Sequence, residues 1–192
     1  MNEQDLVLGL KKGDQSIFKQ IISLYKNKVY NTLLNLLQNV EDAQDLSQEV
    51  FVEVFLSVGK FEGRSSLSTW IYRITVSKGL DYMRRKKRKK RFGVIYSLFK
   101  PESTEPAFEQ ATFNHPALLL ENEEQATILL KAIYQLPEKQ KIAFILSKLE
   151  ELSYQEISQV METSISSVES LLFRAKQNLQ KILADYYTKN YS

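Results

Sequence analysis

Apolar side chains recur at steps of three and four residues along most of the chain, and this spacing is the feature that most constrains the fold. It places apolar side chains on one face of an α-helix. We predict helices at 15–37, 41–60, from about 66 into the basic run 84–91, and at 121–135, 137–149, 153–161 and 165–184. Strand-like alternation does not extend over a useful length. The sequence therefore predicts an all-α protein.

The helical pattern is interrupted once, near the middle of the chain. Three of the four prolines, Pro101, Pro106 and Pro116, fall between residues 100 and 117. Proline disfavours helix continuation and is common in linkers. We therefore predict two small helical domains, 1–91 and 121–192, joined by a linker at 92–120.

Charge is distributed unevenly along the chain. Residues 64–91 hold eleven Lys or Arg and one acid, for a net charge of +10, whereas residues 1–63 carry −3 and residues 92–192 carry −4. A local excess of this size indicates a polyanionic partner that contacts one segment.

The composition disfavours several classes of protein. The chain has no cysteine and one histidine, so disulfides, thiolate metal sites and cysteine nucleophiles are excluded. No catalytic triad, glycine-rich phosphate loop or metal cluster is recognisable. No apolar run approaches the roughly 18–20 residues that span a bilayer. We expect a cytoplasmic protein without direct membrane insertion, without a cofactor or metal, and without enzymatic activity.

The last two predicted helices have the spacing of a helix-turn-helix. The apolar residues Ile157 and Val160 precede the polar turn 162–164, which contains no glycine, and a second apolar stripe follows. The members of that second stripe are Ile165, Val168, Leu172 and Ala175. The outer face of the second helix could contact base edges or phosphates. A plain helical hairpin remains the alternative.

The basic run 84–91 follows a helix that contains Trp70. Cations beside aromatic rings suit unpaired DNA, because the cations hold phosphates and each stacked base contributes about 1–3 kcal/mol. The alternatives are a solvated basic tail and a Trp70 ring that packs in the core.

At this point the residues resemble a known family. DLSQEVF at 45–51, STWIYRI at 68–74 and DYMRR at 81–85 resemble the second conserved region of the extracytoplasmic-function (ECF, group 4) sigma factors of the sigma-70 family. SYQEI at 153–157 and SVESLLFRAK at 167–176 resemble their fourth region. The two motif sets occur in the family's order. The resemblance implies a sigma factor that binds core RNA polymerase and directs promoter-specific transcription initiation.

The resemblance also implies roles for single residues. Those expected to bind the β′ clamp helices of core polymerase are Asp45, Gln48 and Glu49. Those expected at the minus-ten element are Arg64, Ser65, Ser66, Trp70, Arg73, Ser77, Lys78, Arg84 and Arg85. Those expected at the minus-thirty-five element are Ser166, Ser167, Ser170, Phe173, Arg174 and Lys176. The β flap of the polymerase, promoter DNA and an anti-sigma factor are the other implied partners.

Three positions depart from the family pattern. Ser77 stands where we expect asparagine, and Glu169 and Leu171 stand where many relatives have basic residues. These substitutions bear on which DNA sequence is recognised.

Two other functions remain open from the sequence. A conventional helix-turn-helix regulator with an N-terminal oligomerisation or effector domain would explain the second half. That class of regulator does not explain the first half, in which a helix with an acidic face is followed by a helix rich in aromatic and basic residues. An RNA-binding or helical adaptor protein would use the basic run but leaves the helix-turn-helix unexplained.

Overall fold

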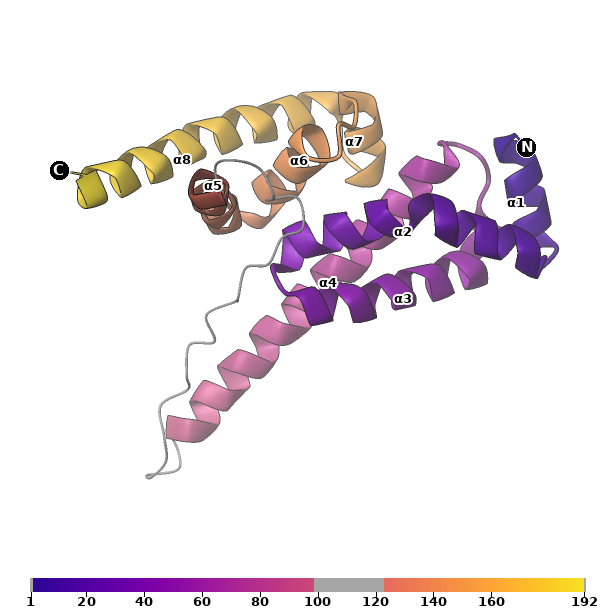
Figure 1. The fold of residues 1–192 in the computed structure, drawn as a ribbon, viewed down its shortest axis with the longest axis horizontal. Coiled ribbons are helices and arrows are strands. Elements are labelled where there is room, and N and C mark those ends of the chain that lie inside the picture. The colour runs from indigo at the N-terminus through magenta and orange to yellow at the C-terminus, as the bar shows by residue number, and fades with distance from the viewer. Residues whose placement is uncertain (1, 99–122, 192) are drawn as a thin grey trace.

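The computed structural model describes residues 2–98 and 123–191, and within these residues all regular structure is helical (Figure 1). The N-terminal half contains α1 (Glu3–Lys11), α2 (Gln15–Leu37), α3 (Val40–Ser57), the short 3₁₀ helix η1 (Val58–Lys60) and α4 (Leu67–Leu98). The C-terminal half contains α5 (Glu123–Gln135), α6 (Glu138–Lys148), α7 (Tyr154–Val160) and α8 (Ile165–Tyr191). The prediction of an all-α chain with two helical parts is confirmed.

Side-chain caps explain where the helices of the N-terminal half begin. Asp14 accepts hydrogen bonds from the backbone N–H groups of Ser16 and Ile17 at the start of α2. Asn39 accepts one from Asp42 N–H at the start of α3. Between these helices Gln38 has a left-handed backbone with φ of 52°, which ends α2 and turns the chain into α3.

The core of the N-terminal half lies between α2, α3 and α4. The stripe predicted on α3 is buried as expected, from Ala43 through Val54, and Phe61 closes its far end. On α2, Ile21 and Leu33 are fully buried, and on α4 so is Leu67. Each fully buried aliphatic side chain contributes roughly 1.5–3 kcal/mol. These contacts, rather than helix propensity, stabilise the bundle.

The observed elements differ from the predicted ones in four places. Residues 58–60, predicted to end the helix that begins near residue 41, form η1, and α8 continues to Tyr191, past its predicted end at residue 184. Helix α1 was not predicted. Helix α4 continues to Leu98, so residues 92–98, which begin the predicted linker 92–120, are helical. The rest of the predicted linker lies outside the described residues.

The two halves pack against each other (Figure 1). Leu36 on α2 and Tyr72 and Val76 on α4 belong to the same apolar cluster as the core of the C-terminal half. The Gln38 side chain donates to the Leu130 carbonyl at 3.0 Å. The core of the C-terminal half is therefore completed by side chains of the N-terminal half.

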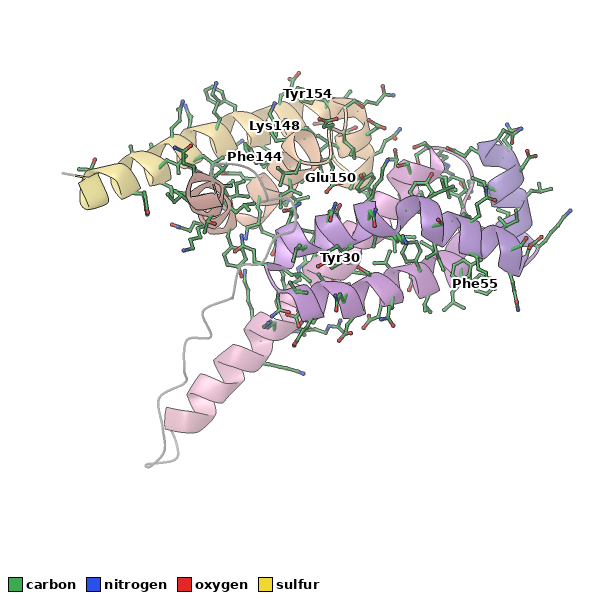
Figure 2. All side chains as sticks on the ribbon, viewed as in Figure 1. Tyr30, Phe55, Phe144, Lys148, Glu150 and Tyr154 are labelled. Carbon is green, nitrogen blue, oxygen red and sulfur yellow. The ribbon has the colours of Figure 1, made fainter. Side chains whose placement is uncertain are left out.

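A partly buried polar contact lies within this interface. The Tyr72 hydroxyl donates to the Glu150 carboxylate at 2.9 Å, and Figure 2 labels Glu150 where the two halves meet. Burial raises the pKa of Glu150, and the hydrogen bond from Tyr72 opposes that shift. Burial beside Glu150 raises the pKa of Tyr72, so its hydroxyl keeps its proton and remains a donor.

Candidate functional site

The outer face of α3 carries the three residues predicted to bind polymerase. Asp45, Gln48 and Glu49 are all exposed. Along the same face, two turns further on, Val52 and Leu56 are 56% and 72% exposed. One exposed surface therefore joins two carboxylates and an amide to an apolar end, and we call it the α3 outer face.

The apolar end of this surface is not among the residues predicted from the sequence. Phe55, which is 38% exposed, belongs to it as well, and its ring lies 5.0 Å from that of Phe18 on α2 (Figure 2). The signal is present in the sequence, because Val52 and Leu56 follow Asp45 at helical spacing while the buried stripe lies on the other side of the helix.

The inner edge of α3 forms ion pairs with α4. Its acids Asp42 and Glu53 pair with lysines of α4: Lys86 Nζ lies 2.9 Å from Asp42, and Lys78 Nζ lies 3.0 Å from Glu53. Lys78, predicted to contact the minus-ten element, is thus engaged in joining α4 to α3. Asp42 and Glu53 therefore help to join α3 to α4, and they are distinct from the acids of the α3 outer face.

A short loop, residues 61–66, leads into α4, and its middle residues 62–64 are exposed. The Ser66 hydroxyl accepts a hydrogen bond from Thr69 N–H at 3.1 Å, so Ser66 caps the helix. Gly63 has a φ of 73°, a conformation that L side chains rarely adopt. Arg64, beside it, is exposed and pairs with Glu62. Ser65 and Ser66 follow Arg64 directly, so the three loop residues predicted to contact the minus-ten element are adjacent in the chain.

Four of the residues predicted to contact the minus-ten element lie along one face of α4, counting its capping residue Ser66. They are Ser66, Arg73, Ser77 and Arg84, all exposed, and their spacing of seven, four and seven residues keeps them on one side of the helix. Lys78 and Arg85 lie about 100° round the helix.

In this structure the C-terminal half contacts that face. Arg73 Nη1 lies 3.2 Å from Glu162 in the helix-turn-helix turn, and Arg84 Nη2 lies 3.6 Å from Glu138 on α6. Both arginines are therefore paired with acids of the C-terminal half.

Trp70 lies in the core. It is 7% exposed, and its ring lies 5.0 Å from the ring of Phe61 at an interplanar angle of 45°. The core alternative for this residue accounts for its position, since its ring does not face solvent where an unpaired base could stack.

The basic run forms the far part of α4. Its first residues still contact the rest of the protein, with Arg84 near Glu138 and Lys86 near Asp42, and the helix then projects beyond α2 and α3 (Figure 1). Arg85, Lys87, Arg88 and Lys89 are exposed. Because consecutive residues point in different directions around a helix, the cations surround the projecting segment rather than forming one stripe.

The helix-turn-helix is present in the C-terminal half. Ser153 and Glu156 form the predicted capping box at the start of α7. Ile157, Val160 and Val168 pack in the core, whereas Ile165, predicted in the same stripe, is 48% exposed. Ser164 caps α8 through the backbone N–H of Ser167 at 3.2 Å.

The outer face of α8 carries the side chains predicted to contact the minus-thirty-five element. Ser166, Ser170, Arg174 and Lys176 are exposed, and Phe173 is 64% exposed. Ser167 is half-buried and its hydroxyl accepts a hydrogen bond from the Ser164 hydroxyl at 3.0 Å. The helix therefore presents hydroxyls, an aromatic ring and cations on one exposed surface.

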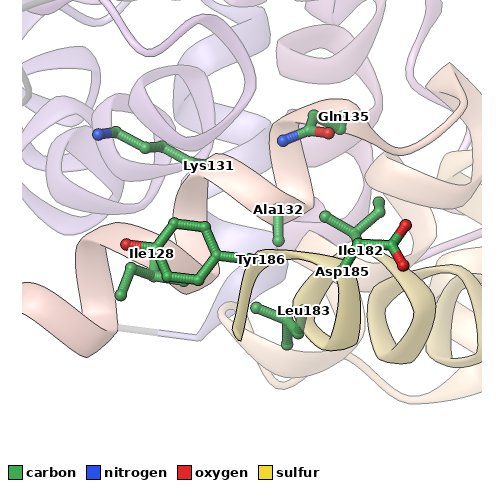
Figure 3. Close-up of a pocket in the computed structure, with 8 residues that line it drawn as sticks. All are labelled: Ile128, Lys131, Ala132, Gln135, Ile182, Leu183, Asp185 and Tyr186. Atoms are coloured by element: carbon green, nitrogen blue, oxygen red, sulfur yellow. The ribbon is translucent and has the colours of Figure 1, made fainter. Parts of the chain in front are cut away.

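A groove of about 320 Å³ lies between α5 and the end of α8 (Figure 3). Its lining residues are Ile128, Lys131, Ala132, Gln135, Ile182, Leu183, Asp185 and Tyr186. These residues belong to α5 and α8.

No described helix combines the length and apolarity that a bilayer crossing requires.

Comparison with known families identifies both halves. The family model for sigma-70 region 2 matches residues 21–89, and the model for sigma-70 region 4 matches residues 126–179. The first match covers α3, loop 61–66 and the first part of α4, and the second covers the helix-turn-helix.

Individual relatives match along nearly the whole chain. RNA polymerase sigma-H factor of Pseudomonas aeruginosa is 28% identical over 191 residues, which cover 94% of this chain and 93% of the relative. The ECF RNA polymerase sigma factor SigW of Bacillus subtilis is 29% identical over 180 residues, which cover 92% and 94%.

Solved structures share the fold. The sigma factor RpoE of Bartonella quintana, solved in complex with the anti-sigma factor NepR, superposes with a TM-score of 0.64 at 22% identity and covers 87% of this chain and 96% of its own. CnrH, solved with the cytosolic domain of CnrY, gives a TM-score of 0.68 at 17% identity and covers 95% and 97%. With two region models in the order of its two halves and ECF factors as full-length relatives, the chain belongs to the sigma-70 family, in its extracytoplasmic-function group, and directs transcription initiation.

Proposed function

We propose that this sigma factor works through three surfaces in sequence. The α3 outer face binds core polymerase at its β′ clamp helices. Loop 61–66 and α4 hold the unpaired minus-ten strand, and α8 enters the minus-thirty-five duplex, with the β flap as a second contact of the C-terminal half. The units that carry these tasks are 1–91 and 121–192, with 92–120 connecting them.

The observation that carries the proposal is the composition of the α3 outer face. Val52 and Leu56 are large apolar side chains left in solvent on a helix whose other side is fully packed. Exposed apolar residues beside charges that could pair with a basic partner are typical of a protein interface. Asp45 and Glu49 give the partner's expected charge: it is positive where it meets the start of α3.

For the minus-ten strand, loop 61–66 supports the proposal through its exposure and backbone. Arg64 is exposed at the turn beside Gly63, where no atom lies within 4 Å of the space a side chain would take. An unpaired base can approach such a backbone closely. Arg73, Ser77, Arg84 and Arg85 continue the surface along α4. We propose that Trp70 acts indirectly, by holding Phe61 at the base of the loop.

For the minus-thirty-five duplex, Arg174 is the most informative residue of α8. It is exposed on the recognition helix beside Phe173 and Ser170. If its guanidinium binds a base edge, Arg174→Ala should weaken duplex binding by about 1–3 kcal/mol. The exposed Lys181, two turns further along α8, provides the control substitution, and an equal loss in Lys181→Ala would show a general charge effect.

We infer that the chain performs no covalent chemistry of its own. Promoter opening would then draw on the binding free energy of unpaired bases, while catalysis belongs to the polymerase in the cytoplasm. An anti-sigma factor is a further proposed partner, because RpoE, which shares the fold, was solved with one.

Reconstituted transcription tests the assignment of surfaces. Purified core polymerase, a promoter library and this chain should give start sites that core polymerase alone does not give. Replacing Asp45, Gln48 and Glu49 together with alanine should abolish core binding while the circular dichroism spectrum stays unchanged. A matched control replaces the exposed residues Glu151, Gln180 and Asp185 of the C-terminal half. Core binding that survives the first set would refute the role of the α3 outer face.

A further inference from the structure

Loop 61–66 is held at both ends by side chains of α1. Lys11 Nζ donates a hydrogen bond to the Phe61 carbonyl at 2.8 Å. At the other end of the loop, the Glu3 carboxylate accepts a hydrogen bond from the Leu67 backbone N–H at 2.9 Å. The donor and acceptor pairs are 50 and 64 residues apart in the sequence. One short helix therefore fixes where the loop begins and where it ends.

We propose that α1 is a brace for this loop, and that Glu3 and Lys11 are positioning residues for recognition of the unpaired minus-ten strand. The inference rests on the proposed function of loop 61–66. It adds two residues that lie outside the loop and outside α4, in a helix that the sequence motifs do not include.

The loop needs such a brace because its middle has few contacts of its own. Glu62, Gly63 and Arg64 are exposed, and nothing lies within 4 Å of the position that a Gly63 side chain would take. Its path is therefore set by its ends. There the Phe61 ring packs on Trp70 and Leu67 is fully buried, and the two α1 hydrogen bonds fix the backbone groups of these same residues.

Helix α1 is itself held firmly enough to act as a support. Leu6 and Leu10 are buried in the core of the N-terminal half. A Cβ added to Gly9 would lie 2.7 Å from the Ile17 side chain, so α1 approaches α2 closely at this point. Asn2 and Asp5 form a capping box that fixes the first turn of the helix.

The chemistry of the two contacts suits a positioning role. The Leu67 N–H is one of the donors that the first turn of α4 leaves without a partner inside the helix. A carboxylate at this place also interacts favourably with the helix dipole. Both contacts join a charged side chain to a backbone group, and hydrogen bonds of this kind are stronger than neutral ones. Water can replace either partner, so their loss should loosen the loop without unfolding the bundle.

The test compares binding of single-stranded DNA with binding of core polymerase. The probe is a single-stranded oligonucleotide that carries the minus-ten sequence selected by the wild-type holoenzyme from a randomised promoter library. Lys11→Met and Glu3→Ala should each weaken binding of this oligonucleotide by the holoenzyme about tenfold. Both should also reduce discrimination at the base that the loop receives. Glu3→Gln keeps an acceptor and should recover part of the loss.

Three controls make the result decisive. Lys12→Met removes an exposed lysine next to Lys11 and should leave binding unchanged. Core polymerase binding and the melting temperature should stay near wild type in the α1 variants. Arg64→Ala tests the loop itself: if it has no effect on the oligonucleotide, the proposed function of the loop fails. If Arg64→Ala weakens binding while Lys11→Met and Glu3→Ala bind and discriminate as wild type does, the brace is refuted. The brace is also refuted if Lys12→Met weakens oligonucleotide binding as much as Lys11→Met does. It is refuted as well if the α1 variants lose core polymerase binding to the same extent as oligonucleotide binding.

Discussion

Glu162 has a left-handed backbone conformation in the turn of the helix-turn-helix, with φ of 50°. A residue with a Cβ pays roughly 1 kcal/mol for this conformation, and glycine does not. The sequence already shows that this turn contains no glycine. We therefore expect Glu162→Gly to raise the free energy of unfolding by about 0.5–1 kcal/mol in urea denaturation followed by circular dichroism.

The matched control for that substitution is Glu162→Ala. It removes the same carboxylate, and with it the exposed ion pair to Arg73, but keeps the Cβ. An exposed pair contributes little to stability. A gain that appears equally in the alanine variant would mean that charge, rather than backbone conformation, is responsible.

Lys141 is a buried cation on α6. It is 7% exposed, and its Nζ lies 3.8 Å from the centroid of the Tyr134 ring. Burial, together with repulsion from Lys87 of the basic run, lowers the pKa of Lys141 to about 8. The unfolded chain keeps the ordinary higher pKa. Between pH 8 and 10 the folded state therefore binds fewer protons, and its stability should rise with pH.

Substitution of Lys141 makes this pH dependence measurable. Lys141→Met keeps the apolar stem and removes the titrating group. The stability of the wild type relative to Lys141→Met should increase by on the order of 2 kcal/mol from pH 8 to pH 10. Lys139→Met, at an exposed neighbouring position, should show no such trend. A flat difference between wild type and Lys141→Met would contradict the depressed pKa.

At the scale of elements, the projecting part of α4 should set how DNA binding depends on salt. Arg88 and Lys89 are exposed there. Each phosphate contact contributes about 0.9 to the slope of log K against log salt concentration. Replacing both residues with glutamine should lower the slope by about 1.8 for DNA of any sequence, measured by fluorescence anisotropy. Replacing the exposed Lys12 and Lys19 near the N-terminus with glutamine should leave the slope unchanged. An equal decrease in that variant would indicate that only the net charge of the protein matters.

How well each element could be predicted depends on how much apolar surface it buries. The starts of α2, α3, α7 and α8 are predicted closely, because an apolar stripe follows a capping side chain. The start of α6 is predicted from Pro137, which provides no side-chain cap. Helix α1 was missed because it is nine residues long and buries only Leu6 and Leu10. The end of α4 is not predicted, because the basic run 84–91 contains no apolar stripe from which a helical period could be followed further.

Site residues were predictable where exposure follows from the helical period. Asp45, Gln48 and Glu49 are exposed for this reason, and so is Arg174. The burial of Trp70 and the pairing of Lys78 with Glu53 depend on how α3 and α4 pack, which no local pattern encodes. The contacts from α1 to loop 61–66 join segments far apart in sequence and were not predictable in the same way.

At the scale of the whole molecule, the two halves share an interface that overlaps the proposed DNA surface. Arg73 and Arg84 pair with Glu162 and Glu138 of the C-terminal half. Exposed ion pairs hold such an interface weakly. Its stronger elements are the apolar contacts of Leu36, Tyr72 and Val76 and the partly buried hydrogen bond from Tyr72 to Glu150. For Arg73 to bind a phosphate, its contact with Glu162 must open.

We therefore expect the halves to separate on promoter binding. The chain has no cysteine, so fluorophores can be attached at Lys19→Cys and Lys181→Cys, one in each half. Energy transfer between them should fall when core polymerase and promoter DNA are added. Tyr72→Phe removes a donor from the half-buried Glu150 and should weaken the closed arrangement by about 1–2 kcal/mol. This variant should show lower energy transfer before DNA is added, whereas Tyr154→Phe, at a position 45% exposed, should not. Unchanged energy transfer in the promoter complex would mean that the interface between the halves persists on DNA, and that Arg73 stays bound to Glu162 rather than to a phosphate.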